Sequence, residues 1–452
     1  TVGARSREAA MGRQSTMQDS VRDSRSRARR FLDLLGPGLV TGAADDDPSG
    51  IATYAQAGAT FRYGQLWTVV LSFPLMAATQ EICDRMAQAT GDSFGRLIRR
   101  RFPHSLRLVI GVLVALLIVA NVVNVAADLM AVGQGMALLH AGPGVVWSGL
   151  FGVAILVAVV AGSFETIGRV FKWLCLVLLV YLGVVVVADV HWSEVLRGLL
   201  GFGFRMTPAY LGLTVAVLGT SISPYMFFWQ TAQRVEELRA QDLGGPRAPT
   251  LSQRTPRARR RAMRDGRIDV VTGMAFSCLI MLAIIIATAA TLGASGQQVA
   301  SAADAAKALE PIAGRWATVL FAIGFIGSGV LAVPVLAASG AAGMAGLTDR
   351  EWGLDRSPAR APLFYLLFGV GIVAGTAMSL AHLDPIRLLV LSAVVNGIAA
   401  GPFLLVMMLI SRDRRIMGRY ANGRVAAALG WTTTVVMCVA GAYGVWYTLA
   451  GG

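Results

Sequence analysis

Residues 36–59 read "GPGLVTGAADDDPSGIATYAQAGA". This segment has the length of a membrane span and carries three consecutive aspartates near its middle. About 20 mostly apolar residues cross the hydrocarbon core of a bilayer. A charged side chain at the bilayer centre costs roughly 2.5–3.5 kcal/mol, so an acidic residue there marks a candidate functional site. A short loop between two half-length apolar runs is the alternative interpretation of Asp45, Asp46 and Asp47.

The composition supports a membrane protein, because 55% of the 452 residues are hydrophobic and only 15% are charged. Eleven apolar runs are long enough to span a bilayer, and we therefore predict an all-α membrane protein with 11 transmembrane helices. These runs lie at residues 35–60, 65–87, 107–139, 146–162, 171–189, 209–232, 269–293, 316–346, 362–382, 386–411 and 425–449.

The net charge of +14 is unevenly distributed between alternate loops. With the N-terminus placed in the cytoplasm, the predicted inner segments hold 33 Lys and Arg residues and the outer segments hold 6. This asymmetry predicts a cytoplasmic N-terminus, in a multi-pass protein of a bacterial inner membrane. Residues 1–30 are predicted to be a disordered basic tail.

The basic run "RTPRARRRAMRDGR", residues 254–267, raises the question of a nucleic-acid partner. The positive-inside distribution instead favours a basic cytoplasmic loop at 234–267 that contacts lipid headgroups. No nucleic-acid partner is predicted, and the lipid bilayer is the expected surrounding.

Two predicted spans contain a proline beside oxygen-bearing side chains, in "DDDPSG" (residues 45–50) and "TSISPY" (residues 220–225). A proline interrupts a helix, and broken backbone at membrane depth must line a cavity covered by protein. The breaks fall in spans one and six, which begin two five-span halves at 31–208 and 209–411. A loop and an eleventh span follow at 412–452.

Matching breaks in two repeats indicate the substrate site of a secondary transporter. A plain proline kink is the alternative interpretation of the break in the sixth span.

The two breaks offer oxygen donors. Asp47 has a carboxylate, Thr220 and Ser223 have hydroxyls, and unwound turns expose carbonyl groups such as that of Ala44. Hard divalent cations prefer such ligands. Because no Lys or Arg lies in the middle of a predicted span, we expect a bound cation or a proton to neutralise the aspartates. The cation is expected as the substrate, and no cofactor is predicted.

These residues resemble the Nramp family of divalent-metal transporters across nearly all of the membrane region, because the first span is similar to that family's "GPG…DPGN…QAGA" pattern. The resemblance implies the leucine-transporter fold, with two inverted five-helix repeats, broken helices 1 and 6, and alternating access. It also implies that Asp47 and the carbonyl group of Ala44 bind the metal.

The chain departs from the family pattern at the site. Gly50 stands where the family has an asparagine, Ser223 where it has a metal-binding methionine, and Tyr225 where it has a histidine. We therefore expect the metal site to comprise Asp47, Ala44 and the positions of Gly50, Thr220 and Ser223. Loss of the soft thioether ligand favours a harder cation.

The family's proton route is also altered. Asp128 matches its aspartate, but Ala131 stands where the glutamate would be. On the tenth span the family's helper glutamine falls on Ala393, and Asn396 lies about one turn further. We expect a pathway or vestibule lined by four side chains, those of Asp46, Asp128, Tyr225 and Asn396.

The altered pattern resembles the Nramp-related magnesium transporters, which implies Mg²⁺ or Mn²⁺ transport without proton coupling. A proton-coupled Mn²⁺ or Fe²⁺ transporter is one alternative. A degenerate transporter scaffold with a sensory role or a non-metal substrate is another. An enzyme is not predicted, because Ser223 has no His or Lys base within a span.

Overall fold

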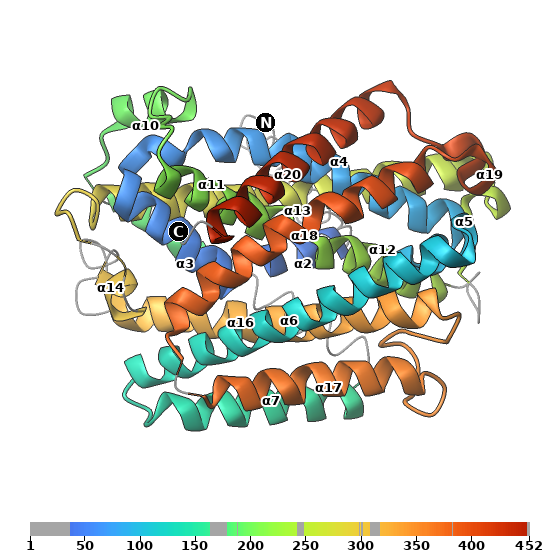
Figure 1. The fold of residues 1–452 in the computed structure, drawn as a ribbon, viewed down its shortest axis with the longest axis horizontal. Helices are drawn as coiled ribbons and strands as arrows, with labels where there is room; N and C mark the ends of the chain where they lie inside the picture. The colour runs from blue at the N-terminus through green and yellow to red at the C-terminus, as the bar shows by residue number, and fades with distance from the viewer. Residues whose placement is uncertain are drawn as a thin grey trace, which may run out of the picture. The chain divides into compact units, whose positions relative to one another are not determined.

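The computed structural model describes residues 37–162, 179–187, 189–241, 248–297, 299, 302–307, 317–381 and 383–449. Within those ranges every regular element is a helix (Figure 1), as the all-α prediction requires. The predicted basic tail at 1–30 lies outside the described residues, as do residues 171–178 and 188 of the fifth predicted span.

The first span is broken, as expected, into α2 (Pro37–Asp45) and α3 (Pro48–Phe61). Asp47 has φ −66° and ψ 170°, the extended conformation into which a following proline forces a residue. Pro48 occupies the first turn of α3, where its missing N–H costs no helical hydrogen bond. The local sequence therefore accounts for the break.

The sixth span is broken in the same way, into α11 (Pro208–Ser221) and α12 (Pro224–Arg239). Ser223 precedes a proline and has φ −79° and ψ 136°, again extended. Both breaks are therefore X-Pro steps that end one helix and start the next.

Most of the remaining long helices match the predicted spans to within a few residues, and short helices lie between them. In the first half they are η1 (Arg62–Gln65), α4 (Trp67–Thr90), α5 (Phe94–Arg101), α6 (His104–Leu138), α7 (Gly144–Ala161), α9 (Val180–Val187) and α10 (Trp192–Leu199). Those that follow α12 are η3 (Leu251–Gln253), α13 (Pro256–Ala290), α14 (Ala302–Lys307), α16 (Ala317–Leu347), α17 (Pro362–Ser379), α18 (Pro385–Ser411), α19 (Arg414–Met417), η5 (Gly418–Tyr420) and α20 (Arg424–Leu449).

Eight of the described helices or helix pairs are long and apolar enough to cross a membrane, and a ninth candidate joins Pro48–Gln65 to Trp67–Thr90 across a 106° bend. Helix α4 alone has 24 residues, which makes it about 36 Å long. We therefore assign that bend to the connection between spans one and two. Among the eleven predicted spans the fifth is described only as α9.

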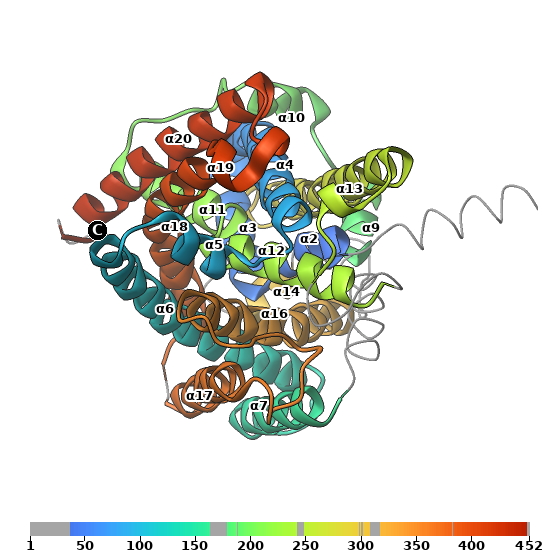
Figure 2. The same cartoon turned by 90° about the vertical axis from the view of Figure 1, so that its right-hand side faces the viewer.

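Corresponding helices of the two halves pack against each other, α4 on α13, α6 on α16 and α7 on α17. The broken helices also meet, α3 with α11 and α2 with α12. Figure 2, which looks along the bundle, shows these four short helices among α4, α13, α16 and α18. Such pairwise contact is what two repeats related by a pseudo-two-fold axis produce, so the fold is the predicted leucine-transporter arrangement.

The basic loop predicted at 234–267 is shorter than expected. Helix α12 continues to Arg239, and α13 already begins at Pro256, so the arginine-rich run forms the first turns of α13. The Thr255 hydroxyl oxygen accepts a hydrogen bond from the Ala258 N–H at 3.3 Å, and arginine is a good helix former. Part of the predicted segment is therefore helical, because high charge indicates exposure and not irregular structure.

Arg234, which the prediction placed in this loop, is buried in α12. Its guanidinium donates to Asp84 of α4 and to Glu237, and its Nη2 lies 2.9 Å from Asp269 Oδ2 of α13. A buried charge is stable only when partners of the opposite sign compensate its desolvation. This cluster therefore ties α12 to α4 and α13.

We predict that Arg234→Met lowers the free energy of unfolding by about 3–5 kcal/mol, because it leaves the Asp84 carboxylate buried without its cation. The measurement is the thermal unfolding midpoint of the purified protein in detergent. Arg257→Met is the matched control, since Arg257 is exposed on α13. Equal midpoints for the two variants would contradict the role given to Arg234.

Candidate functional site

Asp47 caps the N-terminus of α3. Its Oδ1 accepts hydrogen bonds from the Gly50 N–H at 2.8 Å and from the Ser49 hydroxyl at 2.5 Å. The first N–H groups of a helix have no partner within it, and the helix dipole favours negative charge there. The carboxylate, only 1% exposed, is therefore held in one orientation at the break.

The second oxygen of Asp47 faces α6. Asn124 Nδ2 donates to Asp47 Oδ2 at 3.2 Å, and Asn124 is completely buried. A carboxylate has about four lone-pair sites. Among the described residues Oδ1 accepts hydrogen bonds from α3 and Oδ2 accepts one from Asn124, so Oδ2 can still take a cation as a further partner.

The α11–α12 break brings hydroxyl groups to the same region. Thr220 Oγ1 lies 3.5 Å from Ser49 Oγ, at the edge of the Asp47 site. The Ser223 hydroxyl donates to the carbonyl oxygens of Gly219 at 2.7 Å and Thr220 at 2.9 Å. The proton of Ser223 is thus held by the preceding turn of α11, and only its oxygen lone pairs are available to a ligand.

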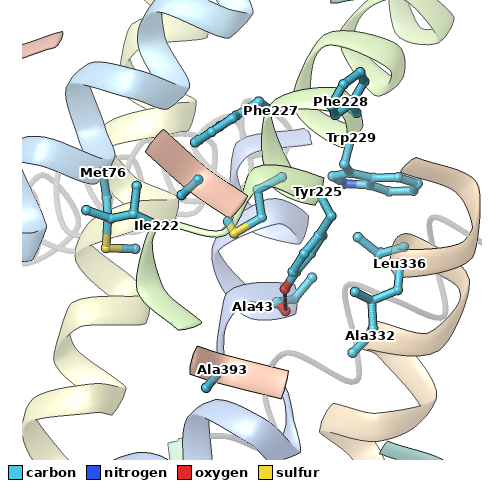
Figure 3. Close-up of a cluster of buried hydrophobic side chains, with 14 of the residues drawn as sticks. Ala43, Met76, Ile222, Tyr225, Phe227, Phe228, Trp229, Ala332, Leu336 and Ala393 are labelled. Carbon is cyan, nitrogen blue, oxygen red and sulfur yellow. Dashed lines mark hydrogen bonds between the residues drawn. The ribbon is translucent and has the colours of Figure 1, made fainter. Parts of the chain in front are cut away.

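Tyr225 joins the two breaks. Its hydroxyl donates to the carbonyl oxygen of Ala44 at 3.1 Å, one of the carbonyls that the end of α2 leaves unpaired. Figure 3 shows the ring between Ala43 of α2 and Ala332 and Leu336 of α16. The carbonyl oxygen of Ala44, predicted as a metal ligand, therefore uses one lone pair to accept from Tyr225 and keeps its second lone pair.

Asp45 and Asp46 face α13. The Ser277 hydroxyl lies 2.7 Å from Asp45 Oδ2 and 3.3 Å from Asp46 Oδ1, and both aspartates are completely buried. Asp45 therefore contacts a neighbouring span. Asp46, expected in a vestibule, lies against α13 and away from solvent.

Gly50 is constrained by its neighbours. A Cβ added to it would lie 3.2 Å from both the Asp45 carbonyl oxygen and Thr220 Oγ1. A larger residue at this position would press on the opposite helix break. The structure therefore gives Gly50 two roles, a backbone donor to Asp47 and space for Thr220.

Asp128 and Asn396 approach the site from other helices. Asp128 is completely buried on α6, and neither of its carboxylate oxygens has a hydrogen-bond partner among the described residues. Asn396 is buried on α18, which packs on both α3 and α11. A Cβ added to Gly219 of α11 would lie 2.2 Å from the Ala393 carbonyl oxygen, so α18 meets the second break through its backbone.

Four buried aspartates thus lie in this region, and none forms an ion pair with a basic side chain of the described residues. Asp45 Oδ1, Asp46 Oδ2 and both carboxylate oxygens of Asp128 have no hydrogen-bond donor among the described residues. Unpaired buried carboxylates are costly, so protons or cations must compensate them.

The described residues contain no group of three or more His, Cys, Asp or Glu arranged to hold a metal ion. Around Asp47 the available ligands are mixed, because amide, hydroxyl and backbone oxygens supplement one carboxylate. Such a set suits a cation that keeps part of its water shell, as Mg²⁺ commonly does.

Three polar residues of the site are absent from the sequence-based set: Ser49, Asn124 and Ser277. Asn124 leaves a signal, because Asn121, Asn124 and Asp128 recur at spacings of three and four in an apolar run, which places them on one helix face. A single serine in a span leaves no comparable signal.

A comparison with protein families finds that residues 38–447 match the model described as "Natural resistance-associated macrophage protein-like" (Nramp). The chain is 28% identical over 446 residues to a divalent metal cation transporter MntH of Ralstonia nicotianae, with 94% of this chain and 92% of the relative covered. It is 29% identical over 417 residues to an MntH of Aeromonas hydrophila, covering 89% and 93%.

Solved structures with the same fold include an Eremococcus coleocola manganese transporter, with a TM-score of 0.71, 18% identity, and coverage of 92% of this chain and 86% of that chain. The transporter Mhp1, of the nucleobase-cation-symport-1 family, matches with a TM-score of 0.54 at 16% identity, covering 91% of each chain. At these identities the likeness concerns the fold.

We predict that Ser277→Ala lowers the free energy of unfolding by about 1–3 kcal/mol, because it removes the donor to two buried carboxylates. Thermal unfolding in detergent measures the change. Ser72→Ala is the matched control, since Ser72 is a buried serine whose hydroxyl has no partner among the described residues. If the two variants unfold at the same temperature, the role given to Ser277 is wrong.

Proposed function

The chain belongs to the Nramp family, and from this premise we propose that it moves a divalent metal cation across a membrane by alternating access. The observation that carries the proposal is Asp47, a buried carboxylate that caps α3 at a broken helix and has a lone-pair site to spare. The named relatives are divalent metal cation transporters, and the related solved structure is of a manganese transporter.

We assign the cation as Mg²⁺ ahead of Mn²⁺. The side chains that contact Asp47 or border it end in oxygen and nitrogen, as in Ser49, Asn124 and Thr220. Ser223 stands where the family carries a methionine thioether, and oxygen ligands favour harder ions. We also assign uptake of the cation without coupled proton movement, because Ala131 and Tyr225 replace ionisable residues of the family's proton route.

A proton-coupled Mn²⁺ transporter is the second candidate, and Asp128 is the observation that favours it. Its carboxylate is buried on α6 without a hydrogen-bond partner in the described part of the chain. Such a group can take up and release a proton as the site opens to either side.

The location follows from charge and from the relatives. The relatives are bacterial proteins, and the positive-inside distribution of the basic residues supports a bacterial inner membrane with the N-terminus in the cytoplasm. The substrate and the lipid bilayer are the partners that this function requires.

We predict that Asp47→Ala abolishes uptake of Mg²⁺ and Mn²⁺ into proteoliposomes, because the carboxylate that caps α3 and faces α6 is lost. Asp384→Asn is the control, since Asp384 is an exposed N-cap of α18 and asparagine caps a helix equally well. Uptake by Asp47→Ala at the parent rate would remove the site from the transport path.

We predict that Ser223→Met raises uptake of Mn²⁺ and Cd²⁺ relative to Mg²⁺, because a thioether sulfur is a soft ligand. The measurement is competition between these ions in proteoliposomes. Ser72→Met is the control, because it places the same side chain in α4, a helix that carries none of the groups bound to Asp47. An unchanged ratio for Ser223→Met would mean that Ser223 does not face the cation.

We predict that uptake of Mg²⁺ leaves the internal pH of the vesicles unchanged. A pH-sensitive dye enclosed in the vesicles measures this while a second dye follows the cation. Acidification that accompanies cation entry and is lost in Asp128→Asn would instead favour the proton-coupled candidate.

A further inference from the structure

One face of α6 carries three buried polar residues within a long apolar stretch of the helix. Asn121, Asn124 and Asp128 are at most 3% exposed and follow one another at spacings of three and four, so they line one side of the helix. Asn121 donates to the Leu336 carbonyl oxygen and to Ser339 of α16. The other two residues lie nearer to the break in the first span.

Asn124 is only half satisfied. Its Nδ2 donates to Asp47, but its carbonyl oxygen Oδ1 is buried and has no partner among the described residues. A buried acceptor without a donor costs free energy and is uncommon in folded proteins. A half-turn of the terminal amide brings Oδ1 to the position from which Nδ2 now reaches Asp47.

Asp128 lies one turn further along the same face. A Cβ added to Gly329 of α16 would lie 3.1 Å from the Asp128 carbonyl oxygen and 3.4 Å from Pro48 Cγ. The backbone of Asp128 is therefore close to the residue that follows Asp47. The carboxyl group of Asp128, buried without a partner in the described ranges, is therefore a second acidic group on this side of the break.

The opposite side of the site offers fewer open acceptors. Ser223 donates its proton to carbonyl oxygens of α11, and Thr220 borders Ser49. Gly50 has no side chain to contribute. Asp45 and Asp46 each have one oxygen without a partner among the described residues, but their other oxygens are bound to Ser277 of α13. On the side that Asp47 Oδ2 faces, the unpartnered oxygens are those of Asn124 and Asp128 on α6.

We propose that the cation is bound between Asp47 and α6, with Asn124 Oδ1 as a direct ligand and the Asp128 carboxylate balancing its second charge. In the absence of cation, Asn124 donates its N–H to Asp47. When a cation binds at Asp47 Oδ2, the amide turns and presents its oxygen. Gly50 stands where the family has an asparagine, so the side-chain amide missing from α3 is supplied instead by Asn124 of the third span. This inference rests on the proposed divalent-cation function.

The test is calorimetric titration of Mg²⁺ and Mn²⁺ into the purified full-length protein in detergent. Asn124→Leu keeps the size of the side chain and removes its oxygen, and we expect affinity for both ions to fall at least tenfold. Asn124→Asp keeps an oxygen at this position, and we expect it to bind at least as tightly as the parent. Asn121→Leu is the control, because Asn121 bonds to α16, and we expect its affinity to stay within twofold.

The outcomes separate this inference from the proposed function. If Asp47→Ala loses binding while Asn124→Leu binds as the parent does, α6 supplies no ligand and the inference is overturned. Weaker binding by Asn124→Asp would overturn it too, and that variant decides the question if Asn124→Leu does not fold. A parent protein that binds neither ion would instead overturn the proposed function.

A second inference comes from a groove of about 800 Å³ between α4, α13 and the start of α20. One end of the groove is lined by apolar residues and the other by arginines. On α4 the apolar residues Phe73 and Pro74 come before Arg85 in the sequence. On α13 and α20 the order is reversed, because the arginines come before the apolar residues. Since α4 runs opposite to α13 and α20 between the predicted membrane faces, one end of the groove is basic and the other apolar.

The basic end is lined by four arginines and one carboxylate, that of Glu81, which attracts both Arg85 and Arg267. Arg85 is paired with Glu81, and Arg264 with Asp265. Arg267 and Arg424 have no carboxylate within 4.0 Å in the described part of the chain. The positive-inside distribution puts this end at the cytoplasmic face, where basic pockets between helices bind anionic headgroups.

We infer that this groove binds an anionic phospholipid, with its phosphate at Arg267 and Arg424 and its acyl chains along Phe73, Val271 and Leu429. The lipid would connect α20 to the ten-helix core. A neutral headgroup lacks the net charge that the two arginines require.

Native mass spectrometry of the full chain with phosphatidylglycerol and phosphatidylcholine tests this inference. We expect the parent to retain phosphatidylglycerol at least tenfold more than phosphatidylcholine, and the double variant Arg267→Gln/Arg424→Gln to lose that preference. Arg257→Gln/Arg260→Gln, exposed on the same helix but outside the groove, should keep it. Equal retention of the two lipids by the parent, an unaffected groove variant, or displacement by inorganic phosphate would overturn the inference.

Discussion

The hydrogen bonds of the Asp47 carboxylate are the interaction on which the site depends. A helix broken inside a membrane exposes N–H and C=O groups that water cannot reach, and each must find a partner within the protein. Asp47 satisfies the start of α3 through Gly50, and Tyr225 satisfies the end of α2 through Ala44. The same groups leave a negatively charged oxygen at mid-site, so the solution to a folding problem also creates a place for a cation.

The contacts between the two halves keep these breaks together. Because α4, α6 and α7 each pack on their counterparts α13, α16 and α17, the short helices α2, α3, α11 and α12 are enclosed by longer ones. The buried Arg234 cluster adds charged ties between α12, α4 and α13. The breaks are therefore held in place both by helix packing and by buried charge.

Much of this architecture could be predicted from the sequence, because its causes are local. Hydropathy locates the spans, and the two breaks are marked by a proline beside oxygen-bearing side chains. Proline alone does not mark a break, because Pro74, Pro334 and Pro402 lie inside continuous helices. Tertiary detail escaped prediction. Nothing in the sequence near Ser223 shows that its proton returns to Gly219, and Asn124 acquires its importance only because α6 passes beside Asp47. Charge also misled, because the arginine-rich run at 256–267 is helical and Arg234 is buried.

A site made of oxygen ligands at a broken helix should select a hard divalent cation. Competition for uptake between Mg²⁺, Mn²⁺, Ca²⁺ and Cd²⁺ in the purified, reconstituted protein measures this selectivity. We expect Mg²⁺ and Mn²⁺ to compete for uptake and Cd²⁺ to compete least. A site that Cd²⁺ fills first, and that Mg²⁺ does not enter, would contradict it.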